Sequence, residues 1–157
     1  MLRLGCRRHA LILLGFFLAL GAIVGAAAQT KQQVDAKMDF LYGAHAPYHA
    51  FFERFQRAVA VGNKSAVADM VLYPITLAGL NGEKLVLDSR KAFITHYDTI
   101  FTPKRIAIVE HQTYATLLPR DEGVMMGQSG EIWFSGICRD SRCKVIKIKI
   151  IALNPSD

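Results

Sequence analysis

The chain has 157 residues, of which 52% are hydrophobic and 20% charged, with three cysteines and a formal net charge of +6. These proportions exclude a long disordered tail, a collagen-like repeat and a small scaffold held by many disulfides. Without its first 28 residues the chain keeps 16 basic side chains against 13 acidic ones, a net charge of +3. A charge this modest favours no polyanion, so we expect no nucleic-acid partner.

Residues 1–28 have the pattern of a secretory signal peptide. Three arginines precede an uncharged run from Ala10, and Ala26-Ala27-Ala28 supplies small residues where a signal peptidase cuts. The alternative is a retained membrane anchor, because the uncharged run to Thr30 reaches the roughly 20 residues that a span needs. No basic cluster follows the run, which favours cleavage before Gln29. We therefore expect one domain, residues 29–157, periplasmic or secreted and without a stable membrane anchor.

Cys138 and Cys143 enclose four polar residues between two β-rich segments, so the two thiols are expected to face each other across a hairpin. An exported protein keeps such a pair oxidised. The spacing C-x4-C differs from the C-x-x-C of redox sites, and the one other cysteine, Cys6, lies in the leader. The sequence therefore predicts a structural disulfide.

Helices are expected in the first half of the domain. Residues 29–42 are interpreted as a loosely held entry segment. Apolar residues then recur at helical spacing over residues 47–61, which predicts an amphipathic helix ended by Gly62-Asn63. A short second helix is predicted over residues 64–71, and Tyr73-Pro74 closes it because the residue before proline avoids helical angles.

A hairpin, a third helix and a set of strands complete the predicted order. Asn81-Gly82 joins two strands at residues 75–80 and 83–87. Asp88 or Ser89 caps the third helix, and residues 104–111 fit either one helical turn or an extended segment. Three strands follow, the second bent by a bulge or a sharp turn at two glycines; these strands are residues 113–118, 123–137 and 144–153. The buried stripe of the third helix is Phe93, Ile94, Tyr97, Ile100 and Phe101.

This order of elements resembles the cystatin-like cone of nuclear transport factor two, which ketosteroid isomerases and polyketide cyclases also use. The resemblance covers residues 51–154 and implies an α+β fold, with N-terminal helices packed on a curved antiparallel sheet in the order helix-helix-hairpin-helix-meander. The chain is also similar to small exported bacterial domains of unassigned activity. The resemblance rests on Gly62-Asn63-Lys64, Val71-Leu72-Tyr73-Pro74, residues 93–103, Gly123-Val124-Met125-Met126-Gly127 and Glu131-Ile132-Trp133-Phe134.

A fold of this kind implies a cone-shaped cavity, where function would normally reside. The hydroxyl of Tyr97, a residue of the buried helix stripe, is expected to reach polar groups of that cavity or a bound ligand. The residues expected to line the cavity or contact a ligand are Tyr48, His49, Phe52, Tyr73, Tyr97 and Trp133.

Catalytic candidates are fewer. Isomerases of this architecture use a buried carboxylate base, and Glu131 beside Trp133 is the nearest candidate for one. His96 and Asp98 flank the helix stripe, although a surface histidine and a solvated carboxylate are the favoured interpretations. His45 and His49 have the i, i+4 spacing of a metal pair, but no third ligand is evident, and we expect no metal and no cofactor.

Two functions follow from these residues. The favoured one is an exported, non-catalytic module that binds a small apolar ligand or a protein partner through its cavity and sheet face, with a homodimer through the sheet as a further prediction. The alternative is a cofactor-free isomerase or lyase that uses His96, Asp98 or Glu131 as its acid-base group.

Overall fold

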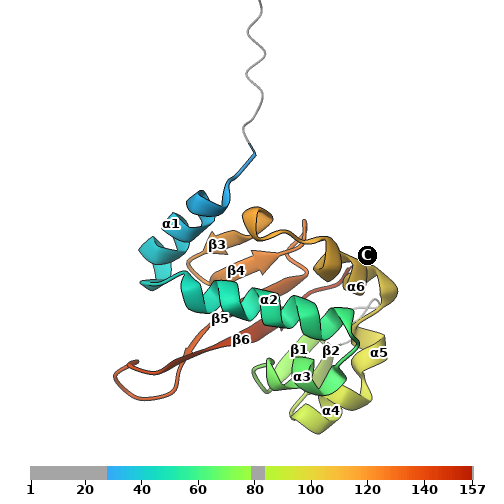
Figure 1. Cartoon of the computed structure of the whole chain (residues 1–157). Coiled ribbons are helices and arrows are strands. Elements are labelled where there is room, and N and C mark those ends of the chain that lie inside the picture. Colours follow the sequence, from blue (N-terminus) through green and yellow to red (C-terminus); the bar gives the residue numbers. More distant parts are fainter. Residues whose placement is uncertain (1–27, 79–83, 157) are drawn as a thin grey trace, which may run out of the picture.

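The computed structural model describes residues 28–78 and 84–156, so all but the last residue of the predicted leader and the predicted Asn81-Gly82 turn lie outside the described residues. Helices from the N-terminal half pack against a curved, unclosed sheet, as the α+β prediction requires (Figure 1). The helices are α1 (Lys31–Tyr42), α2 (Ala46–Ala60), α3 (Lys64–Asp69), α4 (Arg90–Thr95), α5 (Tyr97–Ile100) and α6 (Pro103–His111), followed by the short 3-10 helix η1 (Tyr114–Thr116).

The sheet has six strands in the order β2-β1-β6-β5-β4-β3. All neighbouring pairs are antiparallel except β1 and β6, which run parallel with Leu77 opposite Leu153, so the sheet is mixed rather than antiparallel throughout. The strands are β1 (Ile75–Ala78), β2 (Lys84–Leu87), β3 (Leu118–Arg120), β4 (Gly123–Met126), β5 (Ile132–Cys138) and β6 (Ile146–Leu153).

Aromatic side chains fill the space between α2 and the sheet. Phe51 of α2 lies 5.0 Å, centroid to centroid, from Phe134 of β5. Phe55, one turn later, contacts Phe101 at 6.2 Å, and Phe101 stacks on Tyr97 at 4.8 Å. These rings bury large apolar areas and fix the helices against the sheet. The α2 stripe predicted from the sequence is thus confirmed as the centre of the core.

The first segment of the domain corrects one expectation. Residues 31–42 form a regular helix rather than a loose entry segment. The Thr30 side chain accepts from the Gln33 N–H and the Gln33 side chain accepts from the Thr30 N–H, which is a capping box. Val34 and Met38, one turn apart, are fully buried and attach the helix to the core.

Helix α1 also covers one edge of the sheet. The Tyr42 hydroxyl donates to the Arg120 carbonyl at 2.6 Å and accepts from the Arg120 N–H at 3.2 Å. One side-chain group thus satisfies the donor and the acceptor that β3, as an edge strand, directs away from β4. Figure 1 shows α1 beside β3.

Two predicted elements are divided in the structure. The third helix is broken at His96 into α4 and α5, with Ser89 as the N-cap of α4. The long bent strand predicted over residues 123–137 is instead the antiparallel pair β4 and β5, with Met126 opposite Ile132. Gly127 and Gly130 both have positive φ, at 84° and 72°, and reverse the chain where a bulge or bend was expected.

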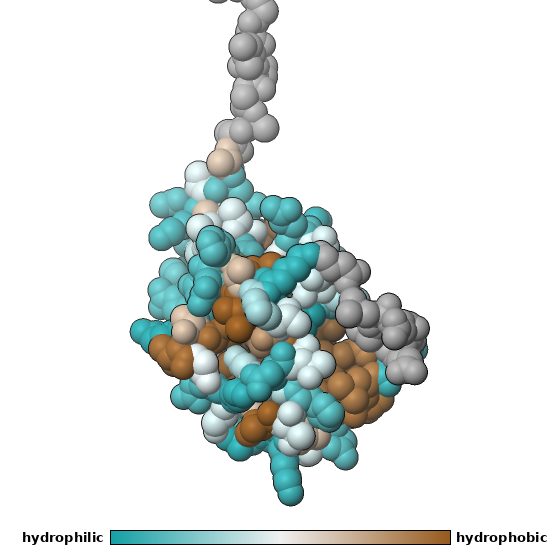
Figure 2. All heavy atoms as spheres, turned by 90° about the vertical axis from the view of Figure 1, so that its right-hand side faces the viewer, coloured by the Kyte–Doolittle hydropathy of each residue, from teal (hydrophilic) through white to brown (hydrophobic). Residues whose placement is uncertain are grey.

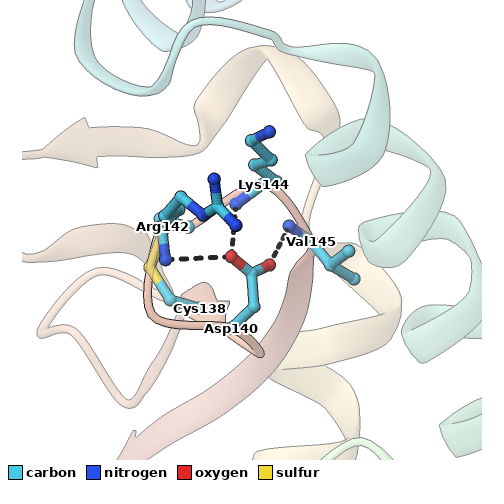
Figure 3. The surroundings of a disulfide bond; sticks show 6 residues. Cys138, Asp140, Arg142, Lys144 and Val145 are labelled. Atoms are coloured by element: carbon cyan, nitrogen blue, oxygen red, sulfur yellow. Dashed lines mark hydrogen bonds between the residues drawn. A yellow bond between two sulfur atoms is a disulfide. The ribbon is translucent and has the colours of Figure 1, made fainter.

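The predicted disulfide joins Cys138 and Cys143 at the end of the β5–β6 hairpin, with Cα atoms 4.7 Å apart. Inside the loop, the Asp140 carboxylate accepts hydrogen bonds from the backbone N–H groups of Arg142, Lys144 and Val145 (Figure 3). Closing so short a loop stabilises the fold by about 2 kcal/mol in the chain-entropy model. The disulfide and the carboxylate together hold the loop in one conformation.

These N–H groups lower the pKa of Asp140 from its ordinary value of 3.8. A carboxyl whose pKa is depressed by folding stabilises the folded loop fully above pH 3.8 and loses that contribution as the pH falls through its lower, folded value. We expect a carboxyl NMR titration of Asp140 to have its midpoint below 3.8. The amide resonances of Arg142, Lys144 and Val145 should shift with the same midpoint.

The control is Asp140→Asn, in which these three amide resonances should lose the acid transition. A midpoint at or above 3.8 in the unmodified chain would show that the carboxylate does not organise the loop.

Candidate functional site

An open cleft of about 850 Å³ lies between α6 and the turn that connects β4 to β5. Its apolar wall comes from Ala107 and Ile108 of α6 and Leu118 of β3. Its polar groups come from α6 as well as from the segments that follow it and the β4–β5 turn. Together with the three apolar residues, the lining consists of Lys104, His111, Gln112, Thr116, Gly127, Gln128, Ser129 and Glu131.

Glu131 supplies a buried carboxylate to this cleft, because the residue is 7% exposed. Its Oε2 accepts from the Ser129 N–H at 3.0 Å. Gly127 makes room for it, since a β-carbon at Gly127 would lie 2.0 Å from the same oxygen. Oε1 accepts no hydrogen bond from the described residues, which leaves one carboxylate oxygen for a bound molecule.

Arg105 is a second buried charged residue, close to Glu131. It is 6% exposed, and its guanidinium donates to the Ile100 carbonyl in α5 and to the Asn154 carbonyl after β6. Burial lowers the pKa of Arg105, and the nearby Glu131 carboxylate opposes part of that shift. The Arg105 Nε is buried with no hydrogen-bond partner among the described residues.

The turn that carries Glu131 is held from several directions. The Asn154 N–H donates to the Glu131 carbonyl at 2.9 Å, and the Asn154 side chain donates to the Gly130 carbonyl at 2.7 Å. From the α6 side, the Gln112 side chain accepts from the Gly127 N–H at 2.9 Å. Backbone groups that are bonded in this way keep the carboxylate in a fixed position.

Helix α6 is fixed in turn by α2. The Gln56 amide donates to the carbonyls of Val109, Glu110 and Gln112, at 2.9, 3.2 and 2.9 Å, and so satisfies the C-terminal end of α6. His111, in the last turn, directs Nδ1 to the Ala107 carbonyl at 2.8 Å. That contact makes Nδ1 the protonated nitrogen and leaves Nε2 as the acceptor in the neutral ring.

None of the six residues predicted to line a cavity or contact a ligand lines this cleft. Tyr48 and Phe52 belong to the core. His49 stacks on Tyr114 with 3.9 Å between centroids. Tyr73 donates to the Ala68 carbonyl, and the Trp133 indole donates to the Gly130 carbonyl.

Tyr97, the sixth of these residues, is 3% exposed, so the predicted burial of its ring is confirmed. Its hydroxyl has no hydrogen-bond partner among the described residues.

Of the three alternative catalytic residues, only Glu131 reaches the cleft. Asp98 is 81% exposed and pairs with Lys64 at 2.6 Å, as a solvated carboxylate does. His96 is half-buried between α4 and α5.

The two histidines of the i, i+4 pair have separate partners, Asp39 for His45 and Glu53 for His49. Residues 28–78 and 84–156 contain no group of three metal-ligating side chains.

The sequence indicated Glu131 but missed the residues that surround it. Lys104, His111, Gln112 and Ser129 carry no motif, and they meet only because α6 folds against the β4–β5 turn. One signal in the sequence could have indicated this site. The pair Gly127 and Gly130 is compatible with a turn that reverses the chain just before the Glu131 carboxylate.

The side of the molecule to which α4, α5 and α6 contribute carries apolar patches separated by hydrophilic side chains (Figure 2).

Comparison with family models, with curated proteins and with solved structures finds no match to this chain. In the described part of the chain, no helix is both long enough and apolar enough to cross a membrane.

Replacing Tyr97 with phenylalanine tests the role of its hydroxyl. The ring keeps its stacking on Phe101, whereas the variant removes a buried hydroxyl without a partner. We expect the free energy of unfolding to rise by about 1 kcal/mol, the lower end of the cost of an unsatisfied buried group. Urea denaturation at constant m-value measures this change, and a fall in stability would show that the hydroxyl has a partner.

Replacing Arg105 with methionine tests the buried cation. The variant leaves the Ile100 and Asn154 carbonyls without their donor, so we expect unfolding to become easier by at least about 2 kcal/mol, because each buried acceptor left unsatisfied costs about 1–3 kcal/mol. Arg57→Met, which removes an exposed guanidinium from α2, is the matched control. Equal losses in the two variants, measured by urea denaturation, would contradict a special role for Arg105.

Proposed function

We propose that the chain is an exported binding module of the nuclear transport factor two-like superfamily, which holds a small, largely apolar ligand in the cleft beside α6. The observation that carries this proposal is the buried Glu131 carboxylate, with one oxygen available, in a cleft with an apolar wall. Export is supported by the leader pattern and by the disulfide between Cys138 and Cys143. The ligand is placed beside α6 because aromatic rings fill the space under α2.

The chemistry of the cleft defines the ligand further. An apolar body fits the wall of Ala107, Ile108 and Leu118. One hydrogen-bond donor, an ammonium or a hydroxyl, fits the available oxygen of Glu131. A carboxylate in the same place would meet the like charge of Glu131 and bind less tightly.

Three probes with the same hexyl chain test this order: hexylammonium, hexanol and heptanoate. We expect the ammonium to bind most tightly and the carboxylate least tightly. The changes in amide chemical shift on binding should be confined to α6 and the β4–β5 turn. Glu131→Gln should weaken hexylammonium at least tenfold, because the charge-assisted hydrogen bond is lost. Titration followed by amide NMR measures these affinities.

The matched control is Glu110→Gln, which removes an exposed carboxylate from the same helix outside the cleft. It should leave hexylammonium binding unchanged. Equal weakening by the two variants, or shifts outside the cleft, would overturn the proposal. Independently of these variants, native mass spectrometry of protein isolated from the exporting compartment would identify a natural ligand that the protein retains.

A cofactor-free enzyme is the second candidate, favoured by the presence of His111 in the same cleft as Glu131. A buried carboxylate can remove a proton next to a carbonyl group, and a second polar group can stabilise the resulting oxyanion.

The protein partner and the homodimer through the sheet remain predictions. Sedimentation equilibrium of the isolated chain tests the dimer.

Deuterium uptake by cyclohexanone in D₂O tests proton removal directly. A catalytic Glu131 should accelerate uptake, with the rate lost in Glu131→Gln and kept in Glu110→Gln. A general base of this type contributes a factor of about 10²–10⁴. NMR integration of the α-protons measures the rate, and uptake equal to that of buffer alone would leave binding without catalysis.

A further inference from the structure

The β5–β6 hairpin projects beyond the helices (Figure 1). It lies at the end of β5 opposite to Glu131, which lines the cleft. Alternate residues of β6 face the same side, and their burial decreases toward the tip. Ile150 is fully buried, Ile148 is half-buried and Ile146 is 48% exposed. The apolar face of the sheet therefore continues past its helical cover. Val145, 54% exposed, is a further exposed aliphatic side chain at the tip.

Basic residues are interspersed with these aliphatic residues along the chain. Residues 138–147 carry four basic side chains and one acidic one, a net charge of +3 that equals the net charge of the whole domain. The single acid, Asp140, already accepts three backbone N–H groups within the loop (Figure 3). The basic residues are Arg139, Arg142, Lys144 and Lys147, and all four are exposed.

The tip is also preorganised. The Cys138–Cys143 disulfide closes the loop, and the Arg139 N–H donates to the Val145 carbonyl at 2.8 Å. A loop already fixed in this way loses little conformational freedom when it binds, so a small contact area suffices.

We propose that this hairpin tip, residues 138–147, binds the surface of an anionic phospholipid bilayer. Lysine and arginine side chains are attracted to acidic headgroups. Exposed aliphatic side chains between them enter the boundary between headgroups and acyl chains. The contact is reversible and peripheral, and it rests on observations independent of the cleft.

Two other partners fit the tip less well. A second copy of the tip would bring +3 against +3 and be repelled. Single-stranded nucleic acid is held by aromatic side chains on which its bases stack, and residues 138–147 contain none. The acidic groups of a soluble protein would pair with the cations but would not bury the exposed aliphatic side chains.

Cosedimentation with vesicles tests the proposal. One set is phosphatidylcholine alone, and in the other about a third of the lipid is phosphatidylglycerol. We expect the chain without its leader to bind only the second set, and to be released as salt screens the charges. The double variant Arg142→Gln/Lys144→Gln should weaken binding about fivefold for each cation removed.

The matched control is Lys84→Gln/Lys91→Gln, which removes two exposed cations from β2 and α4, away from the hairpin. It should keep most of the affinity. Val145→Ser/Ile146→Ser retains every charge and should also weaken binding, since the aliphatic contact is lost. Unchanged thermal unfolding and an intact disulfide establish that the variants remain folded.

Fluorescence gives a second readout. Trp133 is the single tryptophan, so Ile146→Trp in a Trp133→Phe background places the only indole at the tip. Its emission should move to shorter wavelength with phosphatidylglycerol vesicles and stay unchanged with phosphatidylcholine.

Three results would overturn the proposal. The first is no binding to phosphatidylglycerol vesicles. The second is equal weakening by the tip variants and by Lys84→Gln/Lys91→Gln. The third is tip-dependent binding to soluble polyglutamate with no vesicle binding, which would assign the hairpin to an acidic protein instead.

Discussion

A buried cation joins the helices to the end of the sheet. Arg105 donates to carbonyls in α5 and after β6, two segments far apart in the chain, and lies close to the Glu131 carboxylate. A buried charge is no longer solvated by water, so hydrogen-bond acceptors and opposite charges of the protein must stabilise it instead. The path of the chain after β6, the angle of α6 and the location of Glu131 are therefore set together.

Prediction from the sequence succeeded where one element determines its own burial. The stripe of α2 follows from local spacing, and so does the disulfide across the β5–β6 turn. The first helix was missed, although Thr30 and Gln33 form a capping box and Val34 and Met38 recur at helical spacing. Its short, polar sequence gave a weak signal, and packing against η1 and β3 stabilises it.

The site could be predicted only in part for a different reason. Glu131 was singled out because it lies beside Trp133 on the strand predicted over residues 123–137, which is a local observation. The groups around it come from α6, β3 and the β4–β5 turn, and no spacing in the chain relates them. The turn between β4 and β5 was also missed, because one long strand was predicted over residues 123–137. Glycines such as Gly127 and Gly130, which adopt positive φ here, occur in bulges as well as in turns.

Strand β5 separates the two proposed surfaces. Glu131 immediately precedes its first residue, Ile132, and the disulfide residue Cys138 is its last. Seven residues of extended chain span about 20 Å, so a bilayer bound at the hairpin lies well away from the cleft. A ligand in the cleft and a bilayer at the tip therefore do not compete for the same atoms.

The pairing of Tyr42 with Arg120 has a consequence for solubility. The hydroxyl takes the place of a neighbouring strand, so β3 presents no free N–H or C=O at Arg120. A protease cut after α1, or a shortened chain that begins near Gly43, removes this cover. The exposed edge is then a template to which a strand from another molecule can add, which is how sheets begin to aggregate. The first helix thus protects the folded domain against edge-to-edge association, in addition to burying Val34 and Met38.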